Sequence, residues 1–243
     1  MLREIKKRQL ILENRKPFSG GTGDYIRELN ALDWIHSSMR LDGSVLSRPE
    51  TEIILKGGFI ESANLNDHVL IERYADLIKV VNDMLAIESS INKEMIRTFW
   101  QKLSGAGEAS YRKENPVLVS MNYNPPHPSE IEEQMDILMN WFYSDDTESN
   151  PILKAACLHL RIIEVYPFDT FSEAAARAAM YYYLMENGFP AFEIRMKEQE
   201  YNIAVMEYLK KENPGPFCRE VEKSLFNKME LLVQLTAQKE TIY

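Results

Sequence analysis

The spacing of apolar residues constrains this chain most, because it follows the three- and four-residue repeat of an α-helix. Two such stripes are Leu70, Tyr74, Leu77, Ile78, Val81 and Leu85, and then Met95, Ile96, Phe99, Trp100 and Leu103. The pairs Asn150-Pro151 and Asn187-Gly188 are typical of the start and the end of a helix. The pattern therefore predicts an all-α fold.

One stretch departs from helical spacing. Residues 111–121, YRKENPVLVSM, hold a Glu-Asn-Pro turn followed by a short β-prone run. We therefore expect a small β-hairpin there, in which an extended peptide could pair with the exposed strand. The residues of this expected flap are Val117, Leu118, Val119, Ser120 and Met121.

Composition excludes several classes of protein. The net charge is −9, and the absence of any Lys/Arg run argues against a nucleic-acid partner. The two cysteines and four histidines are scattered, so no metal site is expected. No apolar run reaches the ~18 residues of a membrane span, and the start has no signal-peptide core. We expect a cytoplasmic protein without a membrane partner.

Residues 165–180, VYPFDTFSEAAARAAM, hold Tyr166-Pro167-Phe168 and, nine residues further on, Arg177. This run resembles the signature of the Fic family, H-P-F-x-(D/E)-G-N-G-R-x-x-R, which lies on a loop leading into a helix. His159 is similar to a histidine often present on the preceding helix, and residues 107–128 to the flap region of the family. Ser38, Asp42 and Gly43 resemble its inhibitory motif, S/T-x-x-x-E-G/N.

The resemblance runs from about Tyr25 to Leu235 and implies a mainly α Fic-like domain with a small hairpin flap. Residues 1–24 are then an N-terminal arm, and 25–243 a single domain. Within that domain we distinguish N-terminal helices with the inhibitory-like motif (25–105), a Fic core (106–190) and C-terminal helices (191–243).

The resemblance also implies an activity, the transfer of AMP from ATP to a protein hydroxyl with Mg²⁺ as cofactor. The family's histidine is the general base, its acidic residue helps to hold magnesium, and its Gly-Asn-Gly stretch and first arginine cradle the phosphates. Tyr166, Asp169 and Arg177 are the catalytic candidates at or beside these positions, and Ser172, Glu173 and Arg177 are the nucleotide-binding candidates.

This sequence departs from the pattern at most of the chemical positions. Tyr166 replaces the histidine, and a phenol with a pKa of about 10 is a poor base at neutral pH. Thr170 stands at the acidic position, and Ala174 replaces the first arginine. Phe171 and Glu173 replace both glycines, and Thr170 with Glu173 reads as a capping box.

These departures lead to three hypotheses. The first is a degenerate Fic-like protein that lacks ordinary AMP transfer and acts as a binding or regulatory module, with no cofactor. The second is an active transferase that moves AMP or another phosphate-containing group from a nucleotide-like donor; only this one needs ATP and Mg²⁺. The third is a structural component of a homo-oligomer. The expected partner is a protein or an extended peptide that binds at the flap.

Overall fold

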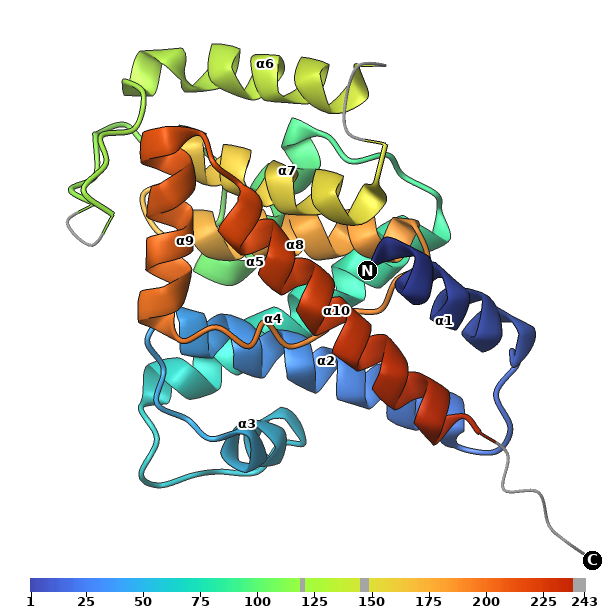
Figure 1. The fold of residues 1–243 in the computed structure, drawn as a ribbon. Helices are drawn as coiled ribbons and strands as arrows, with labels where there is room; N and C mark the ends of the chain where they lie inside the picture. The colour runs from blue at the N-terminus through green and yellow to red at the C-terminus, as the bar shows by residue number, and fades with distance from the viewer. Residues whose placement is uncertain (119–120, 145–148, 238–243) are drawn as a thin grey trace, which may run out of the picture.

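The protein is a bundle of helices, seen in a computed structural model that describes residues 1–118, 121–144 and 149–237 (Figure 1). Over these ranges the chain forms ten α-helices and one short 3-10 helix. Their bounds are α1 Leu2–Asn14, α2 Thr22–Leu41, α3 Arg48–Leu55, α4 Leu65–Ala86, α5 Lys93–Ser104, η1 Pro128–Glu130, α6 Ile131–Tyr143, α7 Pro151–Val165, α8 Ser172–Glu186, α9 Glu198–Lys211 and α10 Gly215–Leu235.

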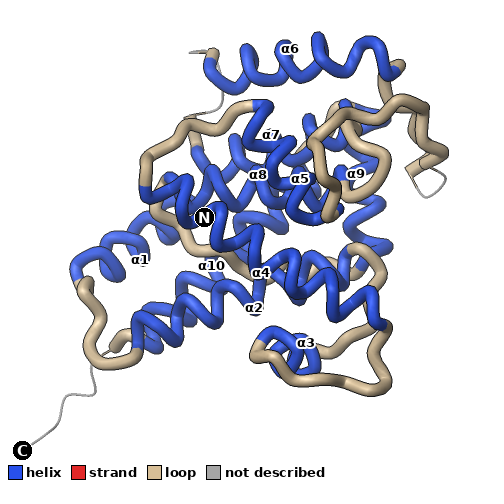
Figure 2. Tube along the Cα trace, turned by 180° about the vertical axis from the view of Figure 1, so that it is seen from behind, coloured by secondary structure: helices blue, strands red, loops and turns tan. Residues whose placement is uncertain are grey.

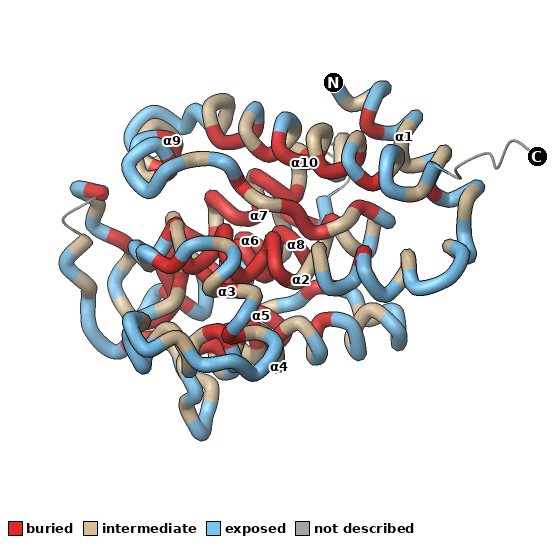
Figure 3. The backbone as a smooth tube through the Cα atoms, turned by 90° about the horizontal axis from the view of Figure 1, so that it is seen from below, coloured by how far each residue is buried: buried red, intermediate tan, exposed pale blue. Residues whose placement is uncertain are grey.

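Helices α7 and α8 form the centre of the bundle. Both are buried along most of their length, with α10 on one side and α5 on the other (Figure 3). The first two turns of α8 are built from small residues, which let its backbone approach α7 closely. These residues are Ala174, Ala175, Ala176, Ala178 and Ala179, and each is at most 1 % exposed. The turn that joins α7 to α8 is therefore fixed at both ends by the core.

The N-terminal residues are more ordered than the expected arm. Residues 2–14 form α1, which buries Ile5 and Leu12 and packs along α10 (Figure 1). Arg8 lies over the ring of Phe226 on α10, 4.3 Å from its centroid. The many charged residues of α1 hid this narrow apolar face in the sequence. Helix α2 begins at Thr22, so the expected boundary between residues 24 and 25 falls inside a helix.

The predicted β-hairpin is not seen. Within the described residues the flap shows a single isolated antiparallel bridge, between Leu118 and Tyr123, and no strand (Figure 2). Its main-chain groups bond elsewhere, since the Arg112 N–H donates to the carbonyl of Pro167 at 3.0 Å. Pro116, Pro125 and Pro126 also have no N–H to give to a ladder. Val119 and Ser120 lie outside the described residues.

No helix of the described ranges is long and apolar enough to cross a membrane.

Candidate functional site

The motif turn, residues 166–171, runs from the end of α7 to the start of α8. Tyr166 and Phe171 both have left-handed backbones, with φ of 45° and 58°. This conformation costs a non-glycine residue roughly 1–2 kcal/mol, so neighbouring contacts must hold it. Phe171 stands where the signature has glycine, yet it adopts the left-handed backbone that glycine tolerates most easily. The main chain of the turn is thus compatible with the glycine pattern although its side chains are not.

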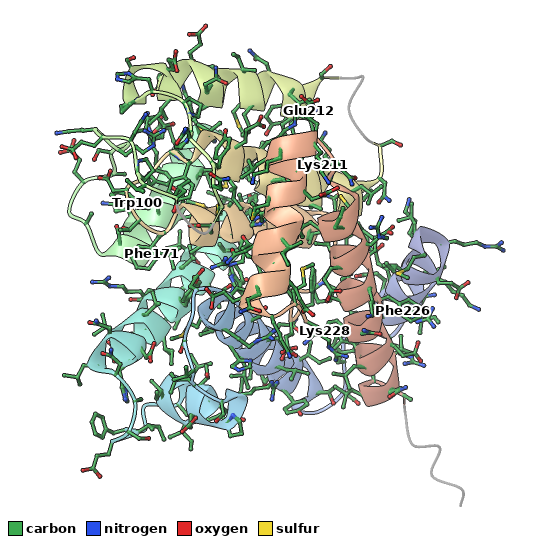
Figure 4. The ribbon with its side chains drawn as sticks, turned by 60° about the vertical axis from the view of Figure 1, so that its left-hand side comes forward. Trp100, Phe171, Lys211, Glu212, Phe226 and Lys228 are labelled. Atoms are coloured by element: carbon green, nitrogen blue, oxygen red, sulfur yellow. The ribbon has the colours of Figure 1, made fainter. Side chains whose placement is uncertain are left out.

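Phe168 anchors the inner side of the turn. Its fully buried ring stacks on Trp100 of α5, with the centroids 5.0 Å apart and the planes at 11°. The indole N–H of Trp100, which Figure 4 labels, donates to the carbonyl of Thr170 at 2.8 Å. Ser172 closes the turn: its hydroxyl accepts from the N–H of Phe168 and donates to its carbonyl, both at 2.9 Å. The nucleotide-binding candidate Ser172 therefore has a structural role here.

Arg112 ties the flap region to the same turn. Only 2 % exposed, its guanidinium donates to the carbonyl of Tyr166 at 2.7 Å and to the side chain of Asn115 at 2.7 Å. A further N–H donates to the carbonyl of Pro126 at 2.5 Å. Arg112 carries no signal in the sequence, because it lies in an irregular segment and most of its partners are main-chain carbonyls that no motif records.

The expected capping box of Thr170 and Glu173 does not form. The N-cap of α8 is Phe171, with no side-chain cap bond. The phenol of Tyr166 instead donates to the Glu173 carboxylate at 3.0 Å. Burial raises the pKa of Tyr166 above its ordinary value, and the charge of Glu173 raises it further. Burial likewise raises the pKa of Glu173, with the negative charge of Asp42 adding to the effect. Tyr166 is therefore a hydrogen-bond donor and not a base.

Arg177 of α8 and Asp42 at the C-cap of α2 form an ion pair. The guanidinium of Arg177 is fully buried and donates to the carboxylate of Asp42, whose side chain is 29 % exposed. It also lies 3.4 Å from the carbonyl of Ser38. Burial opposes the charge of Arg177, but Asp42 holds its pKa well above the ordinary value. The structure thus brings together Arg177, Ser38 and Asp42, although Ser38 contributes its main chain and its hydroxyl has no partner among the described residues.

Two other nitrogen atoms of Arg177, Nε and Nη1, have no hydrogen-bond acceptor within the described part of the chain. The ring of Tyr201 lies 5.8 Å from the guanidinium carbon, and Tyr74 lies beside the pair. Burial raises the pKa of Tyr74 to about 12, with Asp42 contributing. Arg177 therefore keeps donor capacity although one of its nitrogens is engaged by Asp42.

A hollow of about 290 Å³ opens beside the motif turn. Its lining residues are Leu41, Asp42, Met121, Phe171, Glu173, Glu198, Tyr201 and Asn202. Three of them carry carboxylates and none carries a lysine or arginine side chain. Tyr166, Asp169 and Arg177 do not line it, so the three catalytic candidates do not share this cavity.

Of the remaining candidates, only Met121 lines the hollow among the described residues. Asp169 is exposed at the tip of the turn, and Gly43 follows the C-cap of α2 with φ of 90°. Val117 is 86 % exposed, whereas Met121 is buried and reaches the hollow. His159 is a packing residue: its ring stacks on Phe217 at 4.6 Å, and its Nε2 bonds the Tyr201 hydroxyl at 2.9 Å. Burial lowers the pKa of His159 to about 3, so the imidazole is neutral.

The site does not fit the nucleotide cofactor that the signature implies. A triphosphate needs donors and positive charge, but the hollow has three carboxylates, and the one motif arginine is paired with Asp42. The N-terminus of a helix favours a bound anion such as a phosphate. In α8 the carboxylate of Glu173 already occupies the first turn. Across the described ranges no three His, Cys, Asp or Glu residues are placed to hold a metal ion.

The sequence is similar to that of known Fic proteins. Residues 85–184 match the family model described as Fic/DOC family. The protein adenylyltransferase Fic of Nematostella vectensis is 28 % identical over 198 residues, which are 78 % of this chain and 45 % of that protein. The protein adenylyltransferase fic-1 of Caenorhabditis elegans is 22 % identical over 197 residues, 78 % of this chain and 39 % of that protein. The chain thus spans less than half the length of these relatives.

A crystal structure of a Fic domain containing signaling protein from Bacteroides thetaiotaomicron superposes with a TM-score of 0.81. It covers 96 % of this chain and 97 % of that one at 18 % identity, a level that supports the fold alone. This likeness shows that the chain has the all-α Fic fold, and its residues 85–184 are similar to the Fic/DOC family.

Proposed function

We propose that this protein is a catalytically silent Fic protein that does not transfer AMP from ATP and acts as a binding or regulatory module. The observation that carries the proposal is the chemistry of the hollow beside the motif turn. Asp42, Glu173 and Glu198 line it, and no lysine or arginine side chain of the described residues does. Two unit charges of the same sign 4 Å apart repel by about 4 kcal/mol near a protein surface. An ATP polyphosphate in the hollow would be repelled by each of these carboxylates in its ionised form.

The state of the base position supports the same proposal. Loss of a general base lowers a rate by ~10²–10⁴. Tyr166 cannot replace it, because its hydroxyl hydrogen is directed to Glu173 and burial raises its pKa. Loss of a preorganised anion donor removes a further ~10²–10³. These factors are not additive, but together they reduce AMP transfer below an ordinary enzymatic rate.

The binding role rests on the surface around the flap. Val117 is 86 % exposed, and the segment from Pro116 to Leu118 is not part of a sheet. An extended peptide could pair with such a segment through main-chain hydrogen bonds. Arg112 would connect this contact to the motif turn, because its side chain binds both parts. We propose a protein or extended peptide as the partner.

The alternative function is an active Fic-type transferase that moves AMP or another phosphate-containing group from a nucleotide-like donor to a protein hydroxyl. Two observations favour it. The turn keeps the left-handed backbone at Phe171, and Arg177 keeps two nitrogens without an acceptor in the described residues. If the ion pair with Asp42 is all that keeps Arg177 from a phosphate, removal of the Asp42 carboxylate should make the arginine available to bind one.

The test compares the wild-type protein with Asp42→Asn. ATP, CDP-linked and UDP-linked donors are titrated by calorimetry with and without magnesium, and transfer is followed with α-labelled ATP. The proposal expects no binding and no labelled protein for either form, because Glu173 and Glu198 still line the hollow. Asp169→Asn is the matched control, since it removes an exposed carboxylate of the motif turn that does not line the hollow. Magnesium-dependent binding or labelling that increases in Asp42→Asn alone would establish the transferase instead.

A further inference from the structure

A second hollow, of about 270 Å³, lies between α2, α10 and the segment that joins α8 to α9. Its lining residues are Leu29, Asp33, Arg48, Glu193, Arg195, Ser224, Asn227, Lys228 and Leu231. Asp33 and Asp42 are both on or at the end of α2, nine residues apart, so the two sites are separated by about 13 Å of helix rise. The second hollow is therefore distinct from the motif site.

A buried charge cluster forms the floor of this hollow. Lys228 of α10, labelled in Figure 4, is 5 % exposed. Its ammonium group donates to the carboxylate of Asp33 on α2 at 2.7 Å. Arg48 donates to the other oxygen of Asp33 at 2.9 Å. Burial lowers the pKa of Lys228, which the charge of Asp33 opposes. Two cations thus share one carboxylate, and the cluster has a positive excess.

The other acids nearby already have partners. Glu193 lies 3.5 Å from Arg40 and 3.9 Å from His36. Glu220 accepts from the hydroxyl of Ser224 at 2.8 Å and from the main-chain N–H of Arg195 at 3.2 Å. One oxygen of each acid makes these contacts, and neither acid forms an ion pair with the remaining cation of the hollow among the described residues.

That remaining cation is Arg195. Its guanidinium has no ion pair or hydrogen bond with any described residue, and neither does the side-chain amide of Asn227. Lys228 bonds a single oxygen and has further N–H donors. Three cationic side chains and two anionic ones line the hollow, and the donors without partners face the same space.

From this arrangement we propose that the second hollow binds a small oxyanion, the phosphate or carboxylate group of a small molecule. Arg195 supplies the fork of donors that suits such a group, Asn227 supplies an amide N–H, and Lys228 supplies charge from below. The volume suits a compact ligand, because pockets for larger ligands measure ~300–1,000 Å³. The proposal does not depend on whether the motif site transfers AMP.

Calorimetry and thermal melting with sodium phosphate and with sodium acetate, each against sodium chloride of equal ionic strength, test the proposal. Phosphate or acetate should bind and raise the melting temperature, and the better of the two identifies the class of ligand. Arg195→Gln should weaken that binding at least tenfold. Arg195 is exposed, so this variant should fold normally.

Arg219→Gln is the control, because it removes an exposed arginine of α10, the helix that carries Asn227 and Lys228, at a position outside the hollow. Its affinity should stay within twofold of the wild-type value. Asn227→Ala should weaken binding three- to tenfold and provides a second, independent variant. Equal affinity in wild type and Arg195→Gln, or stabilisation by chloride as large as that by both oxyanions, would overturn the proposal.

Discussion

The phenol of Tyr166 donates its hydrogen to the carboxylate of Glu173, 3.0 Å away, across the turn that joins α7 to α8. In the resemblance drawn from the sequence, one of these positions holds the catalytic base and the other a phosphate-binding glycine. Here the two side chains bind each other. The positions of the base and of the phosphate-binding glycine are thus joined by a hydrogen bond within the protein. The effects expected of substitutions at the turn follow from this bond.

Glu173→Gln should stabilise the protein in alkaline solution. Burial and Asp42 raise the pKa of Glu173, so the folded state holds this proton more tightly than the unfolded state does. The free energy of unfolding therefore falls as pH rises from the unfolded pKa through the folded one. Glutamine keeps an acceptor for Tyr166 and never ionises. A gain of about 1 kcal/mol corresponds to roughly 2–4 °C in melting temperature for a domain of this size.

The measurement is a pair of melting curves at pH 5 and pH 8.5 for each protein. The gain of Glu173→Gln over wild type should be larger at pH 8.5, while exposed Asp169→Asn shows no such difference. An equal gain at both pH values would mean that ionisation of Glu173 is not the cause.

Asp42→Ala should destabilise the fold, because it leaves the charge of Arg177 buried without its carboxylate. Removal of one partner of a buried ion pair costs about 3–5 kcal/mol. Part of the Asp42 side chain is exposed, so we expect the lower end, about 3 kcal/mol. Urea denaturation at pH 7 measures the loss. Arg177→Met with Asp42→Ala should be more stable than Asp42→Ala alone, and the reverse order would show that the pair is not the source of the effect.

Phe171→Gly should be more stable than Phe171→Ala by about 1 kcal/mol. Both variants lose the half-buried ring, but only alanine keeps the cost of a side chain at φ of 58°. Denaturant unfolding of the two variants, with Val117→Gly and Val117→Ala as the exposed reference pair, isolates the backbone contribution. Equal stability of the two Phe171 variants would indicate that this turn relaxes when the ring is removed.

Tyr166→His alone should not restore AMP transfer. A base acts only when the phosphate is already held beside the hydroxyl, and positioning dominates this class of reaction. The carboxylates of the hollow would remain, and Glu173 would then accept from the new imidazole. Labelling with α-labelled ATP checks the variant. Efficient labelling by this single substitution would show that the hollow does accept a polyphosphate.

Adding Phe171→Gly, Ser172→Asn, Glu173→Gly and Ala174→Arg should at least restore magnesium-dependent ATP binding, measured by calorimetry. This variant removes Glu173 and supplies the missing donors. It also removes the Ser172 hydroxyl that binds Phe168, so its melting temperature should be lower than that of wild type. If this variant folds but does not bind ATP, the remaining carboxylates of the hollow, Asp42 and Glu198, are what prevents binding.

The helices of the core could be predicted from the sequence because their apolar spacing is regular. The stripe from Leu70 to Leu85 lies in α4, and that from Met95 to Leu103 lies in α5. Helix α1 was not expected, because only Ile5 and Leu12 of its residues are buried. The predicted hairpin is not seen in the described residues: the neighbouring prolines lack N–H groups for a ladder, and Arg112 binds the carbonyls of Glu114 and Pro126.

The candidate site, too, could be predicted from the sequence only in part. The sequence assigned Asp42 to the inhibitory-like motif and Arg177 to the Fic-like signature. In the structure these two residues are in contact. The bond between Tyr166 and Glu173 could not be foreseen, because the sequence suggested that Glu173 would cap its own helix. The role of Arg112 depends on main-chain carbonyls of residues more than fifty positions away, which carry no trace in a local motif.

The left-handed backbone at Phe171 has a consequence for how such a turn changes over generations. Its shape is set from outside by Trp100, Ser172 and Arg112, and not by the residue that adopts it. Mutation can therefore exchange the chemical groups of the turn one at a time while the path of the chain stays the same. A lineage that lost its catalytic side chains in this way would still inherit the frame on which another set could be installed.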